Sequence, residues 1–388
     1  MKILFVSPSS SAYDVLTDFS RQLFEAVHQS NQHAYHYVAS DELDLNQIMN
    51  EISEIIERYE ITHVLGFNAV CFNLFNKISS RDVKLIGWLV DHPSYHFKRL
   101  SQDLDASYIF SSNSNHASYV EELTSCHFAS SAVLGVQNAI YSSSEQPLKQ
   151  REFDIVFVGG WMGEPVKFWQ DIQNPILKKI AESTLEELLF QDQTDPYTAL
   201  KKQFLKNDLA ISENSQLINA MIMNLNDFQR KYSRLKMMSS VVQSGLKTLV
   251  VGNGWSDHFA GSHLFFHDPV PNEFMSKIYE NCKIAICLNS NNGGCERALQ
   301  AIANGSSVFS FGGVPIEELA SKYSGISITP SWQSEMQIST HLKKWHEQIM
   351  TDSKLHPDPI QFTQENSWSK VSERLYQAIQ HIDLAETV

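Results

Sequence analysis

The sequence has few of the features that mark a secreted, metal-binding or membrane-spanning chain. Only five of its 388 residues are cysteine, their number is odd, and no two of them form a C-x-x-C pair. This pattern argues against a disulfide framework, and we expect reduced thiols that are mostly buried. No window is apolar enough for a membrane span, and the apolar run in MKILFVSPSS is too short for a signal peptide. We expect a cytoplasmic protein without a transmembrane segment.

Positive charge is also scarce. Lysine and arginine number 30 against 44 aspartates and glutamates, which gives a net charge of -14. This balance argues against a nucleic-acid partner and against unaided binding to anionic lipid. Metal-binding patterns are weak as well: Asp103-Leu104-Asp105 precedes a predicted strand instead of following one, and His92 and His96 have no evident third ligand. We predict no metal site.

The length allows two domains of about 150 to 200 residues, because 388 residues exceed one ordinary core. The stretch from Cys282 to Gly313 shows what kind of domain to expect. The apolar run Lys283–Leu288 predicts a buried strand, Glu296 begins a helical period that Asn304-Gly305 can end, and Ser307–Phe311 predicts a second strand. The stretch is therefore a βαβ unit with glycine-bearing loops.

The loop and helix start of this unit form the first candidate nucleotide site. Such loops lie at the carboxyl ends of parallel strands, and a helix N-terminus favours phosphate. Arg297 occupies the first helical turn, where an acid is usual, so a cation there indicates an anionic ligand; the alternative is a plain surface arginine. Cys295 could be an activated thiolate at the same helix start. The candidate binding residues here are Asn292, Gly293, Gly294, Glu296 and Arg297.

The rest of the second half supplies a second glycine loop and a long helical insertion. Phe153–Gly160 predicts a strand followed by Gly159-Gly160, which either lets the backbone approach a ligand closely or forms a tight turn. Residues 166–244 show helical periodicity without a convincing strand, and we assign this insertion to acceptor recognition or dimer contacts. The strand pattern resumes at Lys247–Val251.

The first half begins with the strand Lys2–Ser7, a loop and a helix over Asp14–Val27, as a Rossmann-like half does. It lacks the G-x-G-x-x-G fingerprint, so we do not expect it to hold a dinucleotide. The polar stretch Tyr141–Glu152 is the predicted linker between the halves.

The densest group of ionisable side chains in the first half follows the predicted strand Lys84–Val90. Asp91 and His92 lie at its carboxyl end, before a proline that forces a turn. Two interpretations stay open. The pair faces a substrate, or Asp91 caps the next helix and His92 packs inside the loop.

Three segments carry a family resemblance. RALQAIANG at Arg297–Gly305 resembles a helix of the CgeB-like glycosyltransferases, a branch of the GT-B enzymes. KYSRLKMM at Lys231–Met238 and LVVGNGW at Leu249–Trp255 resemble the same family's arginine-bearing helix and its Gly-x-Gly-Trp turn. The likeness covers roughly residues 154–313. It departs from the family at Gln300, where that helix usually has a glutamate that contacts the nucleotide ribose.

The resemblance implies an α/β fold with two Rossmann-like domains and a helical insertion in the C-terminal one. The expected parts are an acceptor domain at 1–141, a linker at 142–152, a nucleotide-sugar domain at 153–362 with the insertion at about 166–244, and a C-terminal helix at 363–388 that returns to the first domain. The donor-binding residues implied in addition to those above are Gly159, Gly160, Arg234, Gly254 and Gln300.

The implied function is transfer of a sugar from a nucleotide-diphosphate sugar to an acceptor hydroxyl on a glycan, lipid-linked saccharide or protein. Arg234 and Arg297 would stabilise the leaving diphosphate in place of Mg²⁺, and His92 or Asp91 would be the base. No cofactor beyond the donor substrate is expected, and a homodimer is possible. The alternatives are a nucleotide-sugar epimerase of the same fold and a non-catalytic module that binds a glycan or protein partner.

Overall fold

The computed structural model describes residues 1–8, 15–30, 32–74, 82–102, 107–131, 134–136, 147–190, 195–211, 215–288 and 295–385. The chain divides into two compact units. The first contains residues Met1–Asn138 and Gln364–Val388, and the second contains Ala139–Thr363. Each unit is described by itself below.

The first unit is built on a parallel sheet whose described strands follow the order β2-β1-β3-β4-β5-β6. The inner strands are buried on both faces, as β1 and β3 show, whereas the described residues of the edge strands β2 and β6 are partly buried or exposed. The strands are β1 (Lys2–Ser7), β2 (His33–Val38), β3 (His63–Phe67), β4 (Lys84–Leu89), β5 (Ser107–Ser111) and β6 (His127–Ser131).

The helices of the first unit connect these strands. The helix α2 shows why the sequence folds this way locally, since Asp44 and Gln47 form a reciprocal capping box at its start. The elements are α1 (Val15–Gln29), α2 (Leu45–Tyr59), the 3₁₀ turns η2 (Val70–Leu74) and η3 (Pro93–His96), α4 (Phe97–Leu100), α5 (His116–Leu123) and α14 (Trp368–Ala385). The C-terminal α14 packs on α1, where Trp368 contacts Phe19 with ring centroids 5.7 Å apart.

The second unit repeats the design with described strands in the order β12-β11-β10-β7-β8-β9, again all parallel. The strands are β7 (Phe153–Val158), β8 (Thr248–Val251), β9 (Leu264–His267), β10 (Cys282–Cys287), β11 (Ser307–Phe311) and β12 (Ile326–Thr329). The chain order reverses between β7 and β10. In open parallel sheets ligands bind at the carboxyl ends of the two strands that flank such a reversal.

The helices of the second unit include the predicted βαβ helix α10 (Glu296–Ala303), which follows β10. The other helices are α6 (Pro175–Phe190), α7 (Pro196–Lys206), α8 (Ser215–Ser244), α9 (Met275–Glu280), α11 (Val314–Lys322) and α12 (Glu335–Thr351). The helix α13 (Pro359–Asn366) begins in this unit and contains the boundary between the units. Short 3₁₀ turns are η4 (Leu148–Gln150), η5 (Phe168–Asp171), η7 (Trp255–Asp257), η8 (Asn272–Phe274) and η9 (Ser353–Leu355).

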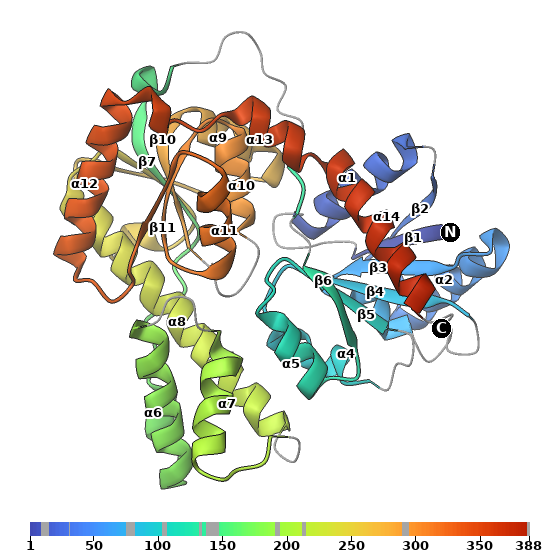
Figure 1. The fold of residues 1–388 in the computed structure, drawn as a ribbon. Coiled ribbons are helices and arrows are strands. Elements are labelled where there is room, and N and C mark those ends of the chain that lie inside the picture. The colour runs from blue at the N-terminus through green and yellow to red at the C-terminus, as the bar shows by residue number, and fades with distance from the viewer. Residues whose placement is uncertain are drawn as a thin grey trace. The chain divides into compact units, whose positions relative to one another are not determined.

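The predicted insertion is helical: the described residues between β7 and β8 contain no strand. In Figure 1, α6, α7 and the first part of α8 extend away from the sheet of this unit. They pack on one another, with an ion pair of 2.8 Å between Lys202 Nζ of α7 and Glu187 Oε1 of α6. The second part of α8 packs against α12, so one helix of 30 residues joins the insertion to the Rossmann-like core.

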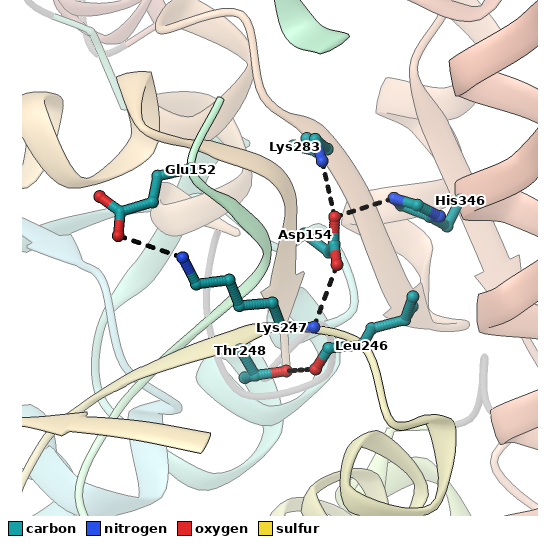
Figure 2. Close-up of polar contacts among 7 residues, drawn as sticks. All are labelled: Glu152, Asp154, Leu246, Lys247, Thr248, Lys283 and His346. Carbon is teal, nitrogen blue, oxygen red and sulfur yellow. Dashed lines mark hydrogen bonds and ion pairs between the residues drawn. The ribbon is translucent and has the colours of Figure 1, made fainter. Parts of the chain in front are cut away.

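A polar cluster joins three elements at the amino end of the second sheet (Figure 2). Asp154 Oδ1 of β7 accepts hydrogen bonds from Lys283 Nζ of β10 at 2.6 Å and from His346 Nε2 of α12 at 3.1 Å. Its Oδ2 accepts from the backbone N–H of Lys247 at 3.0 Å. Burial alone would raise the pKa of Asp154, but these hydrogen bonds outweigh it and hold the pKa well below its usual range.

The end of the predicted linker belongs to the second unit. Leu148 is buried, and the buried guanidinium of Arg151 donates to the carbonyl oxygens of Tyr279, Cys282 and Asn304 at 2.9 to 3.2 Å. The residues that accept these hydrogen bonds are far away in the sequence. The polar composition of the segment therefore predicts a linker, although its end is packed into the second unit.

All five cysteines are free, and all except the half-buried Cys295 are buried. Burial raises the pKa of Cys71, Cys126, Cys282 and Cys287 to about 12, so these thiols are packing groups. In the described part of the chain, no helix combines the length and the apolar character needed to cross a membrane.

Candidate functional site

The loop after β7 is shaped by glycines that no other residue could replace without strain. Gly159 has φ +143°, and its N–H donates to Val251 O at 2.8 Å. Gly252, in the loop after β8, also has φ +143°, and a Cβ there would lie 2.6 Å from the carbonyl carbon of Gly159. The two loops therefore touch through bare backbone at the carboxyl edge of the sheet.

Arg234 reaches this edge from α8. Its Nη1 donates to Gly160 O at 3.1 Å, and its Nε has no hydrogen-bond partner. Only 7% of the residue is exposed. Burial, with the positive charges of Arg297 and Arg230, lowers the pKa of Arg234 to about 9. The guanidinium is still charged at neutral pH, although no carboxylate among the described residues pairs with it.

Arg297 reaches the same edge from the first turn of α10. It is half-buried, and its Nη1 donates to Val158 O at 2.7 Å. A Cβ placed on Gly159 would lie 2.9 Å from Nη1 of Arg234 and 3.3 Å from Nη1 of Arg297. Both guanidiniums therefore lie close to Gly159. We call Gly159, Gly160, Arg234 and Arg297 the two-arginine site.

Like charges brought together in a partly buried place cost free energy unless something neutralises them. Among the described residues neither arginine of the two-arginine site forms an ion pair with an acid. Each keeps N–H groups that its one carbonyl partner does not use. The arrangement is therefore suited to a small anion with several oxygens, for which a guanidinium is a strong partner.

The other predicted binding residues of the second unit differ in their contacts. Glu296 precedes Arg297 in α10, while Nε2 of Gln300 donates to Asn272 Oδ1 at 3.1 Å. Gly254 has φ +84° and packs against Trp161. Asn292, Gly293 and Gly294 lie outside the described residues.

The alternative role of Cys295 as an activated thiolate finds no support in its surroundings. Burial and the negative charge of Glu296 raise the pKa of Cys295 well above its ordinary value. A thiol of this kind stays protonated at neutral pH and is a poor nucleophile.

Two tryptophans of this edge were not predicted as site residues. Nε1 of the fully buried Trp255 donates to Gly159 O at 2.5 Å, and the half-buried Trp161 donates its backbone N–H to Asn253 O at 2.8 Å. Their rings lie edge to face with centroids 5.2 Å apart. The Gly-x-Gly-Trp segment was a signal for Trp255, whereas nothing in the sequence marked Trp161.

In the first unit, Asp91 follows β4 at the carboxyl edge. Its Oδ2 accepts a hydrogen bond from Asn68 Nδ2 at 3.0 Å, and the residue is half-buried. Asp91 does not cap the next turn. That role belongs to His92, whose Nδ1 accepts from the N–H of Ser94 at 3.1 Å at the start of η3.

His92 has no exposed surface. Its ring lies edge to face against His116 and Tyr119, with centroids 4.8 and 5.4 Å away, and its Nδ1 is 2.8 Å from Ser94 Oγ. The side chain is enclosed in this conformation and fixes the start of η3 after β4; its catalytic role stays a prediction. Of the predicted pair, only Asp91 offers a functional group at the surface.

His96 and Arg99 also lie near Asp91. Burial lowers the pKa of His96 to about 4, although the charge of Asp91 opposes this, so the ring is neutral at pH 7. Arg99 Nη1 donates to the carbonyl of Asn68 at 3.0 Å. In the part of the chain that the structure describes, no three His, Cys, Asp or Glu side chains gather as metal ligands would; Asp14, Asp103 and Asp105 lie outside it.

Comparison with solved structures gives this geometry a context. The chain is similar to the sucrose-phosphate synthase of Thermosynechococcus elongatus, with a TM-score of 0.61 and 9% identity over 99% of this chain and 100% of that one. It is similar to AviGT4, a glycosyltransferase involved in avilamycin A biosynthesis, with a TM-score of 0.55 and 8% identity over 98% of this chain and 97% of that one. The chain has the GT-B fold.

A third GT-B structure is that of HepE from Anabaena, solved in complex with UDP, with a TM-score of 0.50 and 8% identity over 98% of this chain and 100% of that one. No protein-family model matches the sequence, and no curated protein sequence matches it. The predicted α/β fold with two Rossmann-like sheets is confirmed, and so is the resemblance to GT-B proteins at the level of fold. The narrower resemblance to the CgeB-like branch stays a prediction.

Proposed function

We propose that the chain is a glycosyltransferase that transfers a sugar from a nucleotide-diphosphate sugar to an acceptor hydroxyl. The observation that carries the proposal is the two-arginine site, where guanidiniums from two distant helices flank Gly159 at the reversal point of a GT-B donor-type domain. The UDP complex of the GT-B protein HepE supports a nucleoside diphosphate as the ligand class.

A diphosphate suits the site because its negative charge would neutralise the two arginines and its oxygens would accept hydrogen bonds from their unused N–H groups. Arg234 has a buried Nε without a partner, and Arg297 lies at the positive end of α10. During transfer, negative charge grows on the leaving diphosphate as the bond to the sugar breaks. Two fixed cations in a partly buried site stabilise this charge, and they would take the role that Mg²⁺ has in metal-dependent enzymes.

On the acceptor side, Asp91 is the proposed base. Its carboxylate stands at the carboxyl edge of the first sheet, with Oδ2 held by Asn68. A carboxylate within hydrogen-bond reach of an acceptor hydroxyl can take its proton as the oxygen attacks the sugar carbon. His92 then supports Asp91 by fixing the backbone that follows it, and does not itself transfer the proton.

Several finer points belong to this proposal. The transfer does not require a divalent metal. The acceptor is a glycan, a lipid-linked saccharide or a protein. The insertion α6–α8 contributes to acceptor or dimer contacts. The cytoplasmic location and the homodimer stay predictions of the sequence.

The proposal is tested by release of nucleoside diphosphate from a panel of UDP-, GDP-, ADP- and dTDP-sugars, with and without a panel of saccharide acceptors. We expect release from one donor class that increases with an acceptor. We also expect strong loss in an Arg234→Ala, Arg297→Ala double variant, but not in Lys343→Ala, which removes one exposed charge on α12. Interconversion of the donor sugar without release would identify an epimerase instead, and binding without turnover would identify a non-catalytic module.

A further inference from the structure

The chain makes an unusual corner directly after β3. Asn68 and Ala69 both have left-handed backbone, with φ of 51° and 55°, although neither is glycine. Two such residues in succession cost roughly 1 to 2 kcal/mol each, and they persist only where the surroundings enforce them.

Two glycines inside the strands make room for this corner. A Cβ on Gly66 of β3 would lie 2.8 Å from Val70 Cγ2, and a Cβ on Gly87 of β4 would lie 2.8 Å from Ala69 Cβ. Glycine in a strand interior lowers strand stability. The fold thus accepts strain at Asn68 and Ala69, together with two unfavourable glycines, to place the corner against the sheet.

All polar groups of Asn68 are engaged by this placement. Its N–H donates to Trp88 O at 2.7 Å, its Oδ1 accepts from the N–H of Val90 at 3.1 Å, and its carbonyl accepts from Arg99 Nη1 at 3.0 Å. The remaining group, Nδ2, donates to Asp91 Oδ2 at 3.0 Å. Asn68 is 5% exposed, so its side chain is fixed at both ends.

We propose that Asn68 is the positioning residue of Asp91, which it holds with one carboxylate oxygen bound and the other presented to the acceptor. The inference rests on the proposed function, because it requires Asp91 to be the base. This role explains why the first of the two left-handed residues is an asparagine. The left-handed backbone orients the side-chain amide so that its Oδ1 accepts a hydrogen bond from the N–H of Val90 while its Nδ2 donates to Asp91.

Two substitutions separate this role from simple support of the turn. Asn68→Gly adopts the left-handed backbone readily but lacks the amide, and Asn68→Asp keeps an acceptor for Val90 but places a second carboxylate against Asp91. The matched backbone control is Asp208→Gly, which changes another left-handed residue, with φ 54°, after α7 in the other unit.

The assay is release of nucleoside diphosphate from the nucleotide sugar that the wild type turns over, with its best acceptor, at pH 5 to 9. Asn68→Gly should lower kcat roughly 10- to 100-fold, the range for losing the support of a reacting group, while the Kd for the nucleoside diphosphate stays unchanged. Asn68→Asp should move the acid limb of the pH profile upward, because a neighbouring carboxylate disfavours ionisation. In an Asp91→Asn background, Asn68→Gly should have no further effect on kcat.

The result that overturns the inference is an Asn68→Gly or Asn68→Asp variant that melts earlier but has wild-type kcat and an unchanged pH profile in its folded fraction. A wild-type chain that releases no nucleoside diphosphate from any donor overturns the proposed function as well. The two failures are therefore distinguished by the wild type alone.

Discussion

Replacing Gly159 by alanine is the smallest change that addresses the two-arginine site as a unit. The added Cβ would lie 2.9 Å from Arg234 Nη1, closer than a Cβ approaches another heavy atom in folded proteins, and 3.3 Å from Arg297 Nη1, which is tighter than most such contacts. The φ of +143° also disfavours any residue with a Cβ. The variant therefore strains the loop and displaces the guanidiniums together.

The two effects have different sizes and different readouts. The backbone strain should lower the free energy of unfolding by roughly 1 to 3 kcal/mol, or about 2 to 12 °C in Tm for a unit of this size. A hydrogen bond between a guanidinium and a phosphate oxygen contributes about 1.5 to 3 kcal/mol. Losing one such bond should raise the Kd for a nucleoside diphosphate roughly 10- to 150-fold.

Calorimetric titration with UDP, GDP and ADP, combined with thermal unfolding, separates these effects. The control is Gly245→Ala after α8, where φ is +68° and a new Cβ meets no atom within 4 Å. It should lose stability without losing affinity. If Gly159→Ala is folded and binds the nucleotide as tightly as the wild type does, the ligand does not lie against the two arginines and the reasoning fails.

Three further predictions concern stability, the anchoring histidine and metal. Asp154→Asn should lower the free energy of unfolding at pH 7 by about 1.5 to 3 kcal/mol. Because the pKa of Asp154 in the folded state lies below its unfolded value near 3.9, urea unfolding should show the difference between variant and wild type shrinking as the pH falls below about 4. A constant difference from pH 7 to pH 3 would contradict this prediction. His92→Ala should lower Tm in calorimetry and leave nucleotide affinity unchanged, since His92 is enclosed; unchanged Tm with lost turnover would show a catalytic role instead. Turnover should persist in excess EDTA, because the two arginines neutralise the negative charge of the diphosphate. Complete loss of turnover that Mg²⁺ or Mn²⁺ restores would reveal a metal-dependent step.

Much of the fold could be predicted because it depends on local patterns. The runs that became β10 and β11 are apolar without Gly or Pro, and the glycine loops interrupt them where the strands end. The edge strand β2 is harder to recognise in the sequence, because its side chains are mostly half-buried and give no strong apolar run. The helical insertion was visible because periodicity over 30 residues of α8 leaves little room for a strand.

The site was predictable only in part, because it depends on residues that meet across the fold. Arg297 stood out by its position in a helix, and Arg234 by the resemblance to a family motif. Asn68 gave no signal, since its partners are Trp88, Val90, Asp91 and Arg99, and their meeting depends on the pairing of β3 with β4. The sequence could not distinguish Asp91 from His92 either, because only packing shows which of two neighbours is enclosed.

The central claim is that a nucleoside diphosphate binds between Arg234 and Arg297, and its most direct test is titration calorimetry with matched nucleoside diphosphates and monophosphates. The account predicts that the wild type binds one diphosphate more tightly than its monophosphate. Arg234→Ala and Arg297→Ala should each weaken diphosphate binding roughly 10- to 150-fold, and Lys343→Ala should not change it. Equal affinity for diphosphate and monophosphate, or wild-type affinity in both arginine variants, would contradict the account.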